Sequence, residues 1–223
     1  MKMFYELPVA NLSPEETMDR LRVKELVEYE RYCTDYRLKD QQKELWFEDG
    51  RIVTTWFNGL FKDYLYASPT HRKDMGEPTA EDKVMRMSVS HRVNDTVVWL
   101  HGDKAVAELL CMLNFRTKMG WEWMDIQCWC RMHYRVEKRD GKWGICYFEG
   151  IYEKDRMDPV FMDGHFVVPR EKLMTYRPNN WNMALRRDVF EGGANEEVEW
   201  VGPDKPETVQ RLYEESSRWM GLE

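Results

Sequence analysis

The stretch that decides the fold is residues 84–153, whose later part reads AVAELLCMLNFRTKMGWEWMDIQCWCRMHYRVEKRDGKWGICYFEGIYE over residues 105–153. Met119–Gly120 and Asp140–Gly141 interrupt it, and such residues tolerate the positive φ of tight turns. We therefore predict an antiparallel meander of three long strands. These strands cover residues 105–116, 121–137 and 143–153.

The middle strand alternates apolar and polar residues with a period of two, which predicts one buried face. The apolar residues are Met124, Ile126, Cys128, Cys130, Met132, Tyr134 and Val136. Trp123 and Trp129 lie on the otherwise polar face. We therefore expect this second face to be covered in part, either by a partner subunit or by the C-terminal tail.

A capping box at Ser13-Pro14-Glu15-Glu16 predicts a helix that begins at Pro14. Apolar residues recur at helical spacing as far as Tyr36, so this amphipathic helix should lie across the sheet. A second, short helix is predicted from Asp40 to Phe47. Asp49–Gly50 should then lead into a strand over residues 51–57.

The segments on either side of the meander are less regular. Residues 58–78 have no period, and we interpret them as an irregular segment at a pocket mouth. Thr79-Ala80-Glu81-Asp82 predicts a short helix to about Met87, followed by the strand that carries His91. The tail is loop-rich, but a last helix is expected from Asp204–Pro206 onward. We expect that helix to pack on the domain or on a neighbouring subunit.

Composition limits the classes of function. The 223 residues carry a net charge of −7 without a basic cluster, which argues against a nucleic acid or an anionic membrane as partner. No signal peptide or membrane span is apparent, so we expect a cytoplasmic protein. Ten Trp, fifteen Met and eleven Tyr fill a core and also suit a pocket for a flat, apolar ligand. No linker separates two cores, so we predict a domain over residues 1–156 and an extension over residues 157–223.

The five cysteines lie inside apolar, periodic segments and are predicted to be buried, reduced thiols. Cys128 and Cys130 share a strand face, but no further Cys or His pair stands at ligand spacing, so we predict no metal site. The sequence also contains no P-loop, GxGxxG, GxSxG or HExxH motif. We therefore expect no cofactor.

Several short patterns together resemble one family. They are Arg31-Tyr32-Cys33 with Lys39-Asp40, Glu48-Asp49-Gly50, His91 with Asn94, Gly102-Asp103-Lys104-Ala105 and Asp140-Gly141-Lys142-Trp143. In order and spacing they resemble the SnoaL-like branch of the nuclear transport factor 2-like superfamily, over about residues 17–152. The resemblance implies an α+β fold, a cone-shaped barrel with a curved antiparallel sheet wrapped around N-terminal helices. It also implies a deep pocket and a homodimer or homotrimer.

Similar members include scytalone dehydratase, bile-acid dehydratase, steroid isomerase and diarylpropane lyases. In the dehydratases a helix tyrosine, an aspartate five residues later and a strand histidine transfer protons. Tyr32 matches that tyrosine and His91 that histidine, whereas Arg37 stands at the aspartate position. Asp35 is close by, but two residues along a helix rotate a side chain by roughly 200°, so we do not expect it to stand in.

His91 is the candidate general base or acid, because imidazole titrates near neutral pH. The alternative is a structural histidine. Tyr32, Asn114 and Arg37 are candidates to stabilise an oxyanion. Period-two alternation places Glu149 on the same strand face as Trp143 and Ile145. On that buried face Glu149 is expected either to pair with a cation such as Arg37 or Arg116, or to be catalytic with a raised pKa. The candidate substrate-binding residues are Tyr36, Trp56, Trp99, Met112 and Arg116.

We therefore predict a cofactor-independent lyase that acts on a hydroxylated aromatic small molecule. A lignin-derived diarylpropane lyase that releases formaldehyde is favoured, because Arg37 stands at the position of the dehydratase aspartate. The alternatives are a dehydratase or isomerase of a polycyclic, steroid-like substrate, and a ligand-binding module without catalysis.

Overall fold

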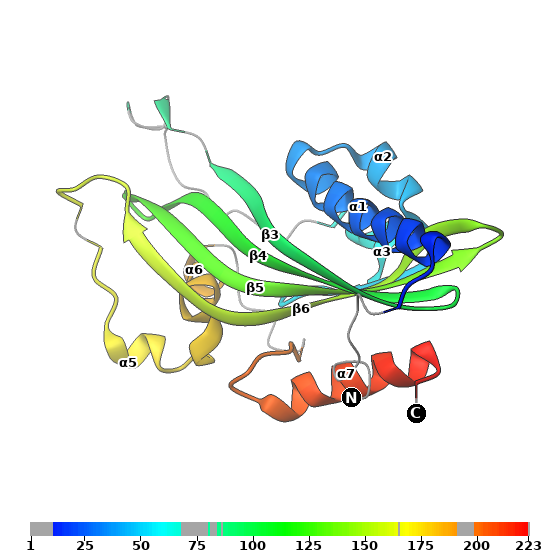
Figure 1. Cartoon of the computed structure of the whole chain (residues 1–223). Helices are drawn as coiled ribbons and strands as arrows, with labels where there is room; N and C mark the ends of the chain where they lie inside the picture. Colours follow the sequence, from blue (N-terminus) through cyan, green and yellow to red (C-terminus); the bar gives the residue numbers. More distant parts are fainter. Residues whose placement is uncertain are drawn as a thin grey trace.

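The computed structural model describes residues 11–67, 80, 84, 85, 87–164, 166–190 and 199–222. Within these residues one six-stranded sheet has the order β2-β1-β6-β5-β4-β3 (Figure 1). The strands are β1 (Trp46–Val53), β2 (Asn58–Leu60), β3 (Ser88–His101), β4 (Lys104–Met119), β5 (Glu122–Arg139) and β6 (Lys142–Pro159). The helices are α1 (Pro14–Tyr36), α2 (Lys39–Glu44), α3 (Phe61–Tyr64), α5 (Arg170–Leu173), the 3-10 helix η2 (Pro178–Asn180), α6 (Trp181–Phe190) and α7 (Pro206–Met220).

The predicted meander is confirmed as the antiparallel series β4, β5 and β6, with β3 added at its edge. Gly120, Asp140 and Gly141 have the positive φ that its turns require. The sheet as a whole is mixed, since β1 runs parallel to β6. The expectation of a wholly antiparallel sheet is corrected on that point, and the α+β, cone-like class is confirmed.

The two faces of the sheet are covered by different parts of the chain. The apolar residues of β5 are buried on the inner face, where Val23 and Val27 of α1 belong to the same core. Helix α7 covers the opposite, outer face (Figure 1). The C-terminal tail is therefore what covers the second face of β5 within this chain.

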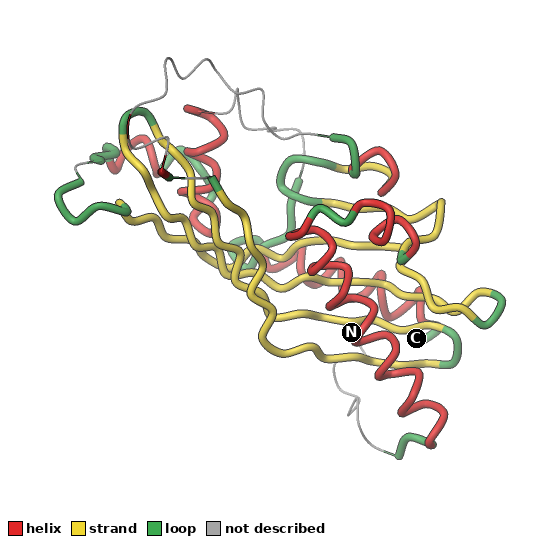
Figure 2. Tube along the Cα trace, turned by 90° about the horizontal axis from the view of Figure 1, so that it is seen from above, coloured by secondary structure: helices red, strands yellow, loops and turns green. Residues whose placement is uncertain are grey.

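Helix α1 has the boundaries that its sequence predicts. Ser13 Oγ accepts from the amide of Glu16 at 3.2 Å, and the amide of Ser13 donates to Glu16 Oε2 at 2.7 Å. The helix ends at Tyr36, and the capping residue Arg37 has a left-handed backbone with φ 58°. In Figure 2 α1 runs across one half of the strands' length, while α6 lies beside the other half.

Helix α2 is shorter than predicted, because it ends at Glu44 and β1 already begins at Trp46. Trp46 stacks on Phe61 with ring centroids 4.0 Å apart, and this packing favours the extended chain. Gly50 is needed within β1, since a Cβ there would approach the Trp46 ring to 2.8 Å. The irregular segment includes β2 and α3. The helix predicted up to Met87 lies mainly outside the described residues.

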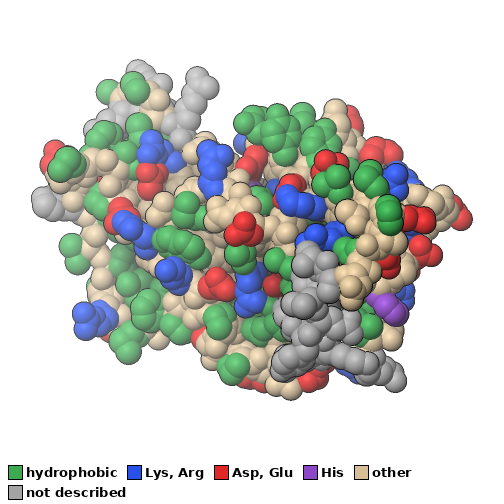
Figure 3. All heavy atoms as spheres, viewed as in Figure 1, with side chains coloured by type: hydrophobic (Ala, Val, Ile, Leu, Met, Phe, Trp, Pro, Cys, Tyr) green, Lys and Arg blue, Asp and Glu red, His purple; other side chains and the backbone are tan. Residues whose placement is uncertain are grey.

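The predicted C-terminal helix is confirmed as α7, which Gly221 closes with φ 80°. His133 on β5 links it to the sheet, with Nε2 2.8 Å from Ser216 Oγ and Nδ1 2.9 Å from Glu108 Oε1. The five cysteines are free thiols, of which Cys146 is half-buried and the others are buried. Figure 3 shows acidic and basic side chains interspersed over one face of the molecule.

Candidate active site

A cavity of about 500 Å³ lies between α1, α2, α6 and the inner face of the sheet. Its described lining consists of Arg31, Thr34, Arg37, Lys39, Gln42, Thr54, Thr55, Trp56, Tyr64, Leu65, Ala67, Val89, His91, Leu113, Phe115, Cys130, Met132, Phe148, Gly150, Tyr152, Met183, Arg186 and Arg187. A hollow of this size suits a small organic ligand. The predicted residues that it includes are His91, Arg37 and Trp56.

His91 and Asp35 form a closely bonded pair beside the cavity. The Nδ1 atom of His91 lies 2.6 Å from Asp35 Oδ1, and the His91 amide donates to Asp35 Oδ2 at 2.7 Å. The His91 side chain is 7% exposed and that of Asp35 is 13% exposed. A single carboxylate thus fixes both the backbone and the ring of His91.

The protonation state of His91 follows from these contacts. Burial lowers the pKa of the ring, the bond to Asp35 opposes this, and the charge of Arg31 lowers it further. The net pKa lies below the ordinary value of 6.5, so the ring is neutral at pH 7. Because a carboxylate accepts hydrogen bonds, Nδ1 carries the proton and Nε2 is left with a lone pair.

The expectation that Asp35 cannot stand in for the missing aspartate is wrong. The expectation took the side-chain directions of Asp35 and Arg37 from one continuous helix. In the structure α1 ends at Tyr36, and Arg37 has a left-handed backbone. The 200° rotation therefore does not describe these two positions. Asp35 faces β3 from the last turn of α1, and Arg37 lies at the cavity rim.

A buried polar network lies next to this pair. Glu30 is fully buried and accepts from Arg31 Nε at 2.5 Å, from Gln42 Nε2 at 2.7 Å and from the Tyr134 hydroxyl at 2.9 Å. The Arg31 guanidinium also lies 5.1 Å from the Phe148 ring centre. These contacts join α1, α2 and the sheet, and so hold in place the helix that carries Asp35.

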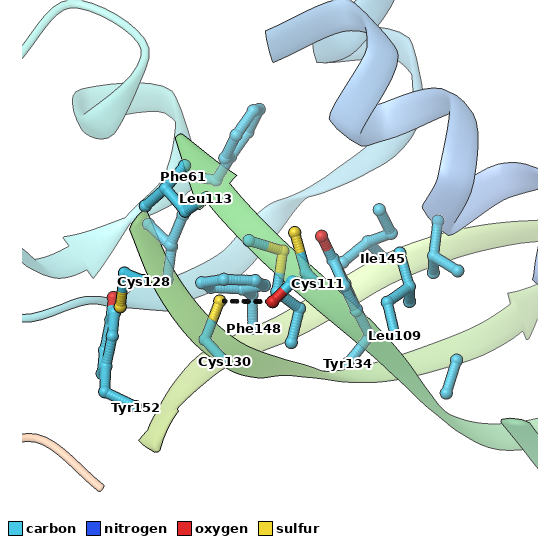
Figure 4. Packing of buried hydrophobic residues seen from close by; sticks show 14 of the residues in the cluster. Phe61, Leu109, Cys111, Leu113, Cys128, Cys130, Tyr134, Ile145, Phe148 and Tyr152 are labelled. Carbon is cyan, nitrogen blue, oxygen red and sulfur yellow. Dashed lines mark hydrogen bonds between the residues drawn. The ribbon is translucent and has the colours of Figure 1, made fainter. Parts of the chain in front are cut away.

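The remaining walls are largely aromatic. Trp56 and Tyr64 lie 5.2 Å apart between ring centres. Phe148, Tyr152 and Cys130 also line the cavity, and Figure 4 shows the Cys130 thiol directed to the Cys111 carbonyl, at 3.6 Å. Burial raises the pKa of the Tyr64 hydroxyl, which therefore stays protonated and able to donate.

Tyr32 and Tyr36, both expected in the pocket, lie on the outer face of α1. They are 50% and 64% exposed, and their rings contact each other at a tilt of 31° with centroids 4.4 Å apart. Hydrophobic side chains gather near this end of α1 in Figure 3. On a helix, Tyr32 points roughly 100° away from Arg31 and 200° away from Thr34, the two residues of α1 that line the cavity. Both tyrosines thus lie outside the described lining of the cavity.

Four other predicted residues lie on the outer face of the sheet. Met112, Asn114 and Arg116 line a separate hollow of about 330 Å³, where Arg116 is bound to Asp125 at 2.6 and 2.7 Å. Trp99 packs against Val106 and Met220. Alternation along β4 explains this, since its inner positions are Cys111, Leu113 and Phe115.

Glu149 also faces outward, contrary to the expectation that it shares a face with Trp143 and Ile145. The register of β6 shifts at Cys146, and this bulge turns the following residues over. Glu149 pairs with neither predicted arginine but accepts from the Tyr147 hydroxyl. Burial raises the pKa of Glu149, which agrees with the alternative that expected a raised pKa. Glu149 nevertheless lies outside the described lining of the cavity.

Sequence reasoning missed several lining residues, among them Gln42, Tyr64, Arg186 and Arg187. The pair of adjacent arginines next to the apolar residues Met183, Ala184 and Leu185 was the signal available for α6. Among the described residues no group of three or more His, Cys, Asp or Glu side chains is arranged to hold a metal ion. None of the described helices has both the length and the apolar character of a membrane-spanning segment.

Comparisons with known proteins agree with this architecture. The family model of the SnoaL-like domain matches residues 15–149. Pea pathogenicity protein 2 of Fusarium vanettenii is 25% identical over 95% of this chain and 90% of its own, and a PEP2-like protein of the same fungus is 23% identical over the same shares. The crystal structure of the hexachlorocyclohexane dehydrochlorinase LinA-type3 from Novosphingobium barchaimii has a TM-score of 0.50. It is 15% identical over 69% of this chain and 97% of its own, a likeness of fold.

Proposed function

Because this chain belongs to the SnoaL-like domain family, we propose that it is a cofactor-independent lyase acting on a hydroxylated aromatic small molecule. The observation that carries the proposal is the neutral His91, held by Asp35 at 2.6 Å beside a cavity of about 500 Å³. A neutral imidazole oriented by a carboxylate is suited to general base catalysis.

The proposed reaction is an elimination. The Nε2 atom of His91 removes a proton from the carbon next to a hydroxyl-bearing carbon, and the electron pair left behind forms the double bond as the C–O bond breaks. The imidazolium, stabilised by Asp35, returns the proton to the leaving oxygen, so the products are an alkene and water. Arg37 at the rim and the Tyr64 hydroxyl are candidates to stabilise negative charge on oxygen.

Asp35 removes the reason for preferring the diarylpropane lyase over a dehydratase, because the carboxylate partner of His91 is present. Dehydration is therefore our first proposal. Release of formaldehyde from a lignin-derived diarylpropane is the second, supported by aromatic side chains in the cavity lining, such as Trp56 and Phe148. The two reactions differ in the mass that the substrate loses.

A screen of hydroxylated diaryl and steroid compounds by mass spectrometry, without added cofactor, tests the proposal. We expect loss of water or of formaldehyde with the wild-type protein and no product with His91→Asn. The matched control is His101→Asn, since His101 lies on the same strand and its Nδ1 is 2.8 Å from the Met220 carbonyl, on the outer face. Turnover that persists in His91→Asn would refute the assignment.

The same screen separates the other classes. An isomerase changes a compound without changing its mass, and a binding module returns every compound unchanged. Assembly as a homodimer or homotrimer, a cytoplasmic location and the division at residue 156 remain predictions.

A further inference from the structure

Two thiols meet on neighbouring strands at the inner face of the sheet. Cys111 on β4 is the direct cross-strand partner of Cys130 on β5. The Cys130 thiol points to the Cys111 carbonyl at 3.6 Å (Figure 4), and it also forms a hydrogen bond with the Cys111 thiol. The two residues are 4% and 3% exposed. They therefore form a buried dithiol that links two strands.

The geometry of this pair is close to that of a disulfide. The Cβ atoms of directly opposed residues lie about 4.5–5.5 Å apart, and a disulfide needs about 3.5–4.5 Å. Cys128 is less suited as a partner of Cys130, because two positions along a strand separate side chains by about 6.6 Å. The cross-strand partners of Cys128 are Leu113 and Asp155. Cys111 and Cys130 are thus the cysteines that the register of the sheet brings together.

The dithiol belongs to the wall of the cavity. Cys130 is part of the described lining, so a small molecule that enters the cavity can reach the pair from inside. On the other side, Cys111 is the cross-strand partner of Val93, which follows His91 by two positions and faces the same side of the sheet. The charge of Asp35 also acts on the Cys111 thiol. A change in this pair is therefore felt next to the His91 site.

The surroundings give the two sulfur atoms different roles. The hydrogen bond from Cys130 lowers the pKa of the Cys111 thiol, and the charge of Arg31 and the amide of Arg92 act in the same direction against burial. The same hydrogen bond, together with burial, raises the pKa of Cys130. Since the thiolate is the nucleophilic form of cysteine, Cys111 is the attacking sulfur and Cys130 the resolving one.

We propose that Cys111 and Cys130 are a redox modification site, which hydroperoxides close to a cross-strand disulfide and small thiols reopen. The Cys111 thiolate attacks one oxygen of hydrogen peroxide, the O–O bond breaks, and a sulfenic acid and hydroxide form. Cys130 then attacks that sulfur, the S–S bond forms, and the oxygen leaves as water. The proton lost by Cys111 converts the hydroxide to a second water. A reducing thiol reverses the closure by exchange and is itself oxidised to a disulfide.

Closure changes the cavity wall. The Cys130 sulfur leaves the Cys111 carbonyl, and the Cβ atoms approach each other by about 1 Å, which draws β4 and β5 together. A displacement of about 1 Å near a catalytic group costs up to about 10²-fold in rate. Resting on the proposed function, turnover by the disulfide form should therefore fall by at least about tenfold, and dithiothreitol should restore it.

Mass spectrometry of the whole chain tests the closure independently of turnover. The reduced wild-type protein is treated under native conditions with a small excess of hydrogen peroxide, and should lose about 2 Da in a manner that dithiothreitol reverses. Trypsin cleaves after Arg116 and Lys118, so the two cysteines fall on separate peptides. After the free thiols are alkylated and the protein is digested, these two peptides should be found joined.

A second reagent tests the same pair without oxidation. Phenylarsine oxide bridges two adjacent thiols and releases water, and one molecule should bind to each native wild-type chain. Cys111→Ser and Cys130→Ser should lose both the joined peptides and this binding. Cys128→Ser is the matched control, because Cys128 is a buried thiol on the same strand and the same tryptic peptide as Cys130, and it should keep both. The measurements on the wild-type protein do not depend on the folding of any variant.

The inference would be overturned if the native wild-type protein gave no joined peptides, or only sulfinic and sulfonic acids on single cysteines. Joined peptides that persist in Cys130→Ser would place the disulfide at Cys128 and would also overturn it. Unchanged turnover by the disulfide form would contradict the effect on the cavity wall. If the disulfide forms but no hydroxylated compound is converted in a manner that needs His91, the lyase proposal fails and the redox site stands.

Discussion

Replacing Asp35 with Asn tests the pair at the centre of the proposed mechanism. The carboxylate accepts two hydrogen bonds from His91, at 2.6 Å from the ring and 2.7 Å from the amide. An Asn side chain has one oxygen and one NH₂ group in their place. If its oxygen faces the amide, its NH₂ faces Nδ1, and the imidazole proton must move to Nε2. If its oxygen faces the ring, two donors meet at the amide.

The magnitude follows from what is lost. Bonds to charged groups are worth about 1.5–3 kcal/mol each, and Asp35 also stabilises the imidazolium that forms in the transition state. With one bond removed and this charge stabilisation lost, we expect the barrier to rise by about 3–4 kcal/mol. That corresponds to a decrease in kcat of roughly 10²- to 10³-fold. KM should change by less than about threefold, because Asp35 acts through His91 and not on the ligand.

The pH profile adds a second readout. His91 has a lowered pKa, so its base form persists below pH 6.5, and the acid limb of kcat/KM should lie below that value in the wild-type protein. Asp35 is the group that opposes this lowering. In Asp35→Asn the limb should therefore move to still lower pH while the plateau falls.

The assay is steady-state kinetics on the substrate found in the cofactor-free screen, with circular dichroism to verify folding. Asp40→Asn is the matched control, since Asp40 is an exposed aspartate on α2, and it should retain wild-type kinetics. The reasoning would be refuted by an Asp35→Asn protein that is folded and keeps kcat within about threefold of wild type.

Three further predictions concern stability, measured by urea unfolding. Glu30→Gln leaves buried Arg31 without its carboxylate and should lower the free energy of unfolding by about 3–5 kcal/mol. The control Glu25→Gln, at an exposed position, should lower it by less than about 0.5 kcal/mol. Equal losses would contradict the buried network. Leu212→Ala removes a buried side chain of α7 and should cost about 2–5 kcal/mol, and a loss below about 1 kcal/mol would mean that α7 does not stay on the sheet. Glu149 has a raised folded pKa, so the wild-type protein should lose more stability than Glu149→Gln as pH rises from 4.5 through that pKa. Asp155, whose pKa burial raises to about 6, contributes equally to both proteins, so parallel pH curves would count against the assignment.

Local sequence signals predicted the frame of this fold well. The capping box at Ser13, the period of β5 and the turn at Asp140–Gly141 each depend on near neighbours in the chain, and each is confirmed. The family resemblance added the cone-like sheet and the position of His91 next to the cavity. These features could be predicted because each depends on residues close together in the chain, or on several short motifs in a fixed order.

The errors at the site have physical causes that the sequence does not display. Asp35 was excluded as the partner of His91 because the helix was assumed to continue through Arg37, whereas α1 ends at Tyr36. Period-two counting across the bulge at Cys146 placed Glu149 on the wrong face. Arg186 and Arg187 reach the cavity because of the position at which α6 packs against the sheet. That contact is set by tertiary structure and by the cap that Asp155 provides.

The most direct test of the central claim is the protonation of the two ring nitrogens of His91, measured by nitrogen-15 NMR at pH 7. For this residue of the cavity lining, the structure predicts a proton on Nδ1, an unprotonated Nε2 and a pKa below 6.5. A proton on Nε2, or a ring that is charged at pH 7, would contradict the assignment of His91 as the general base.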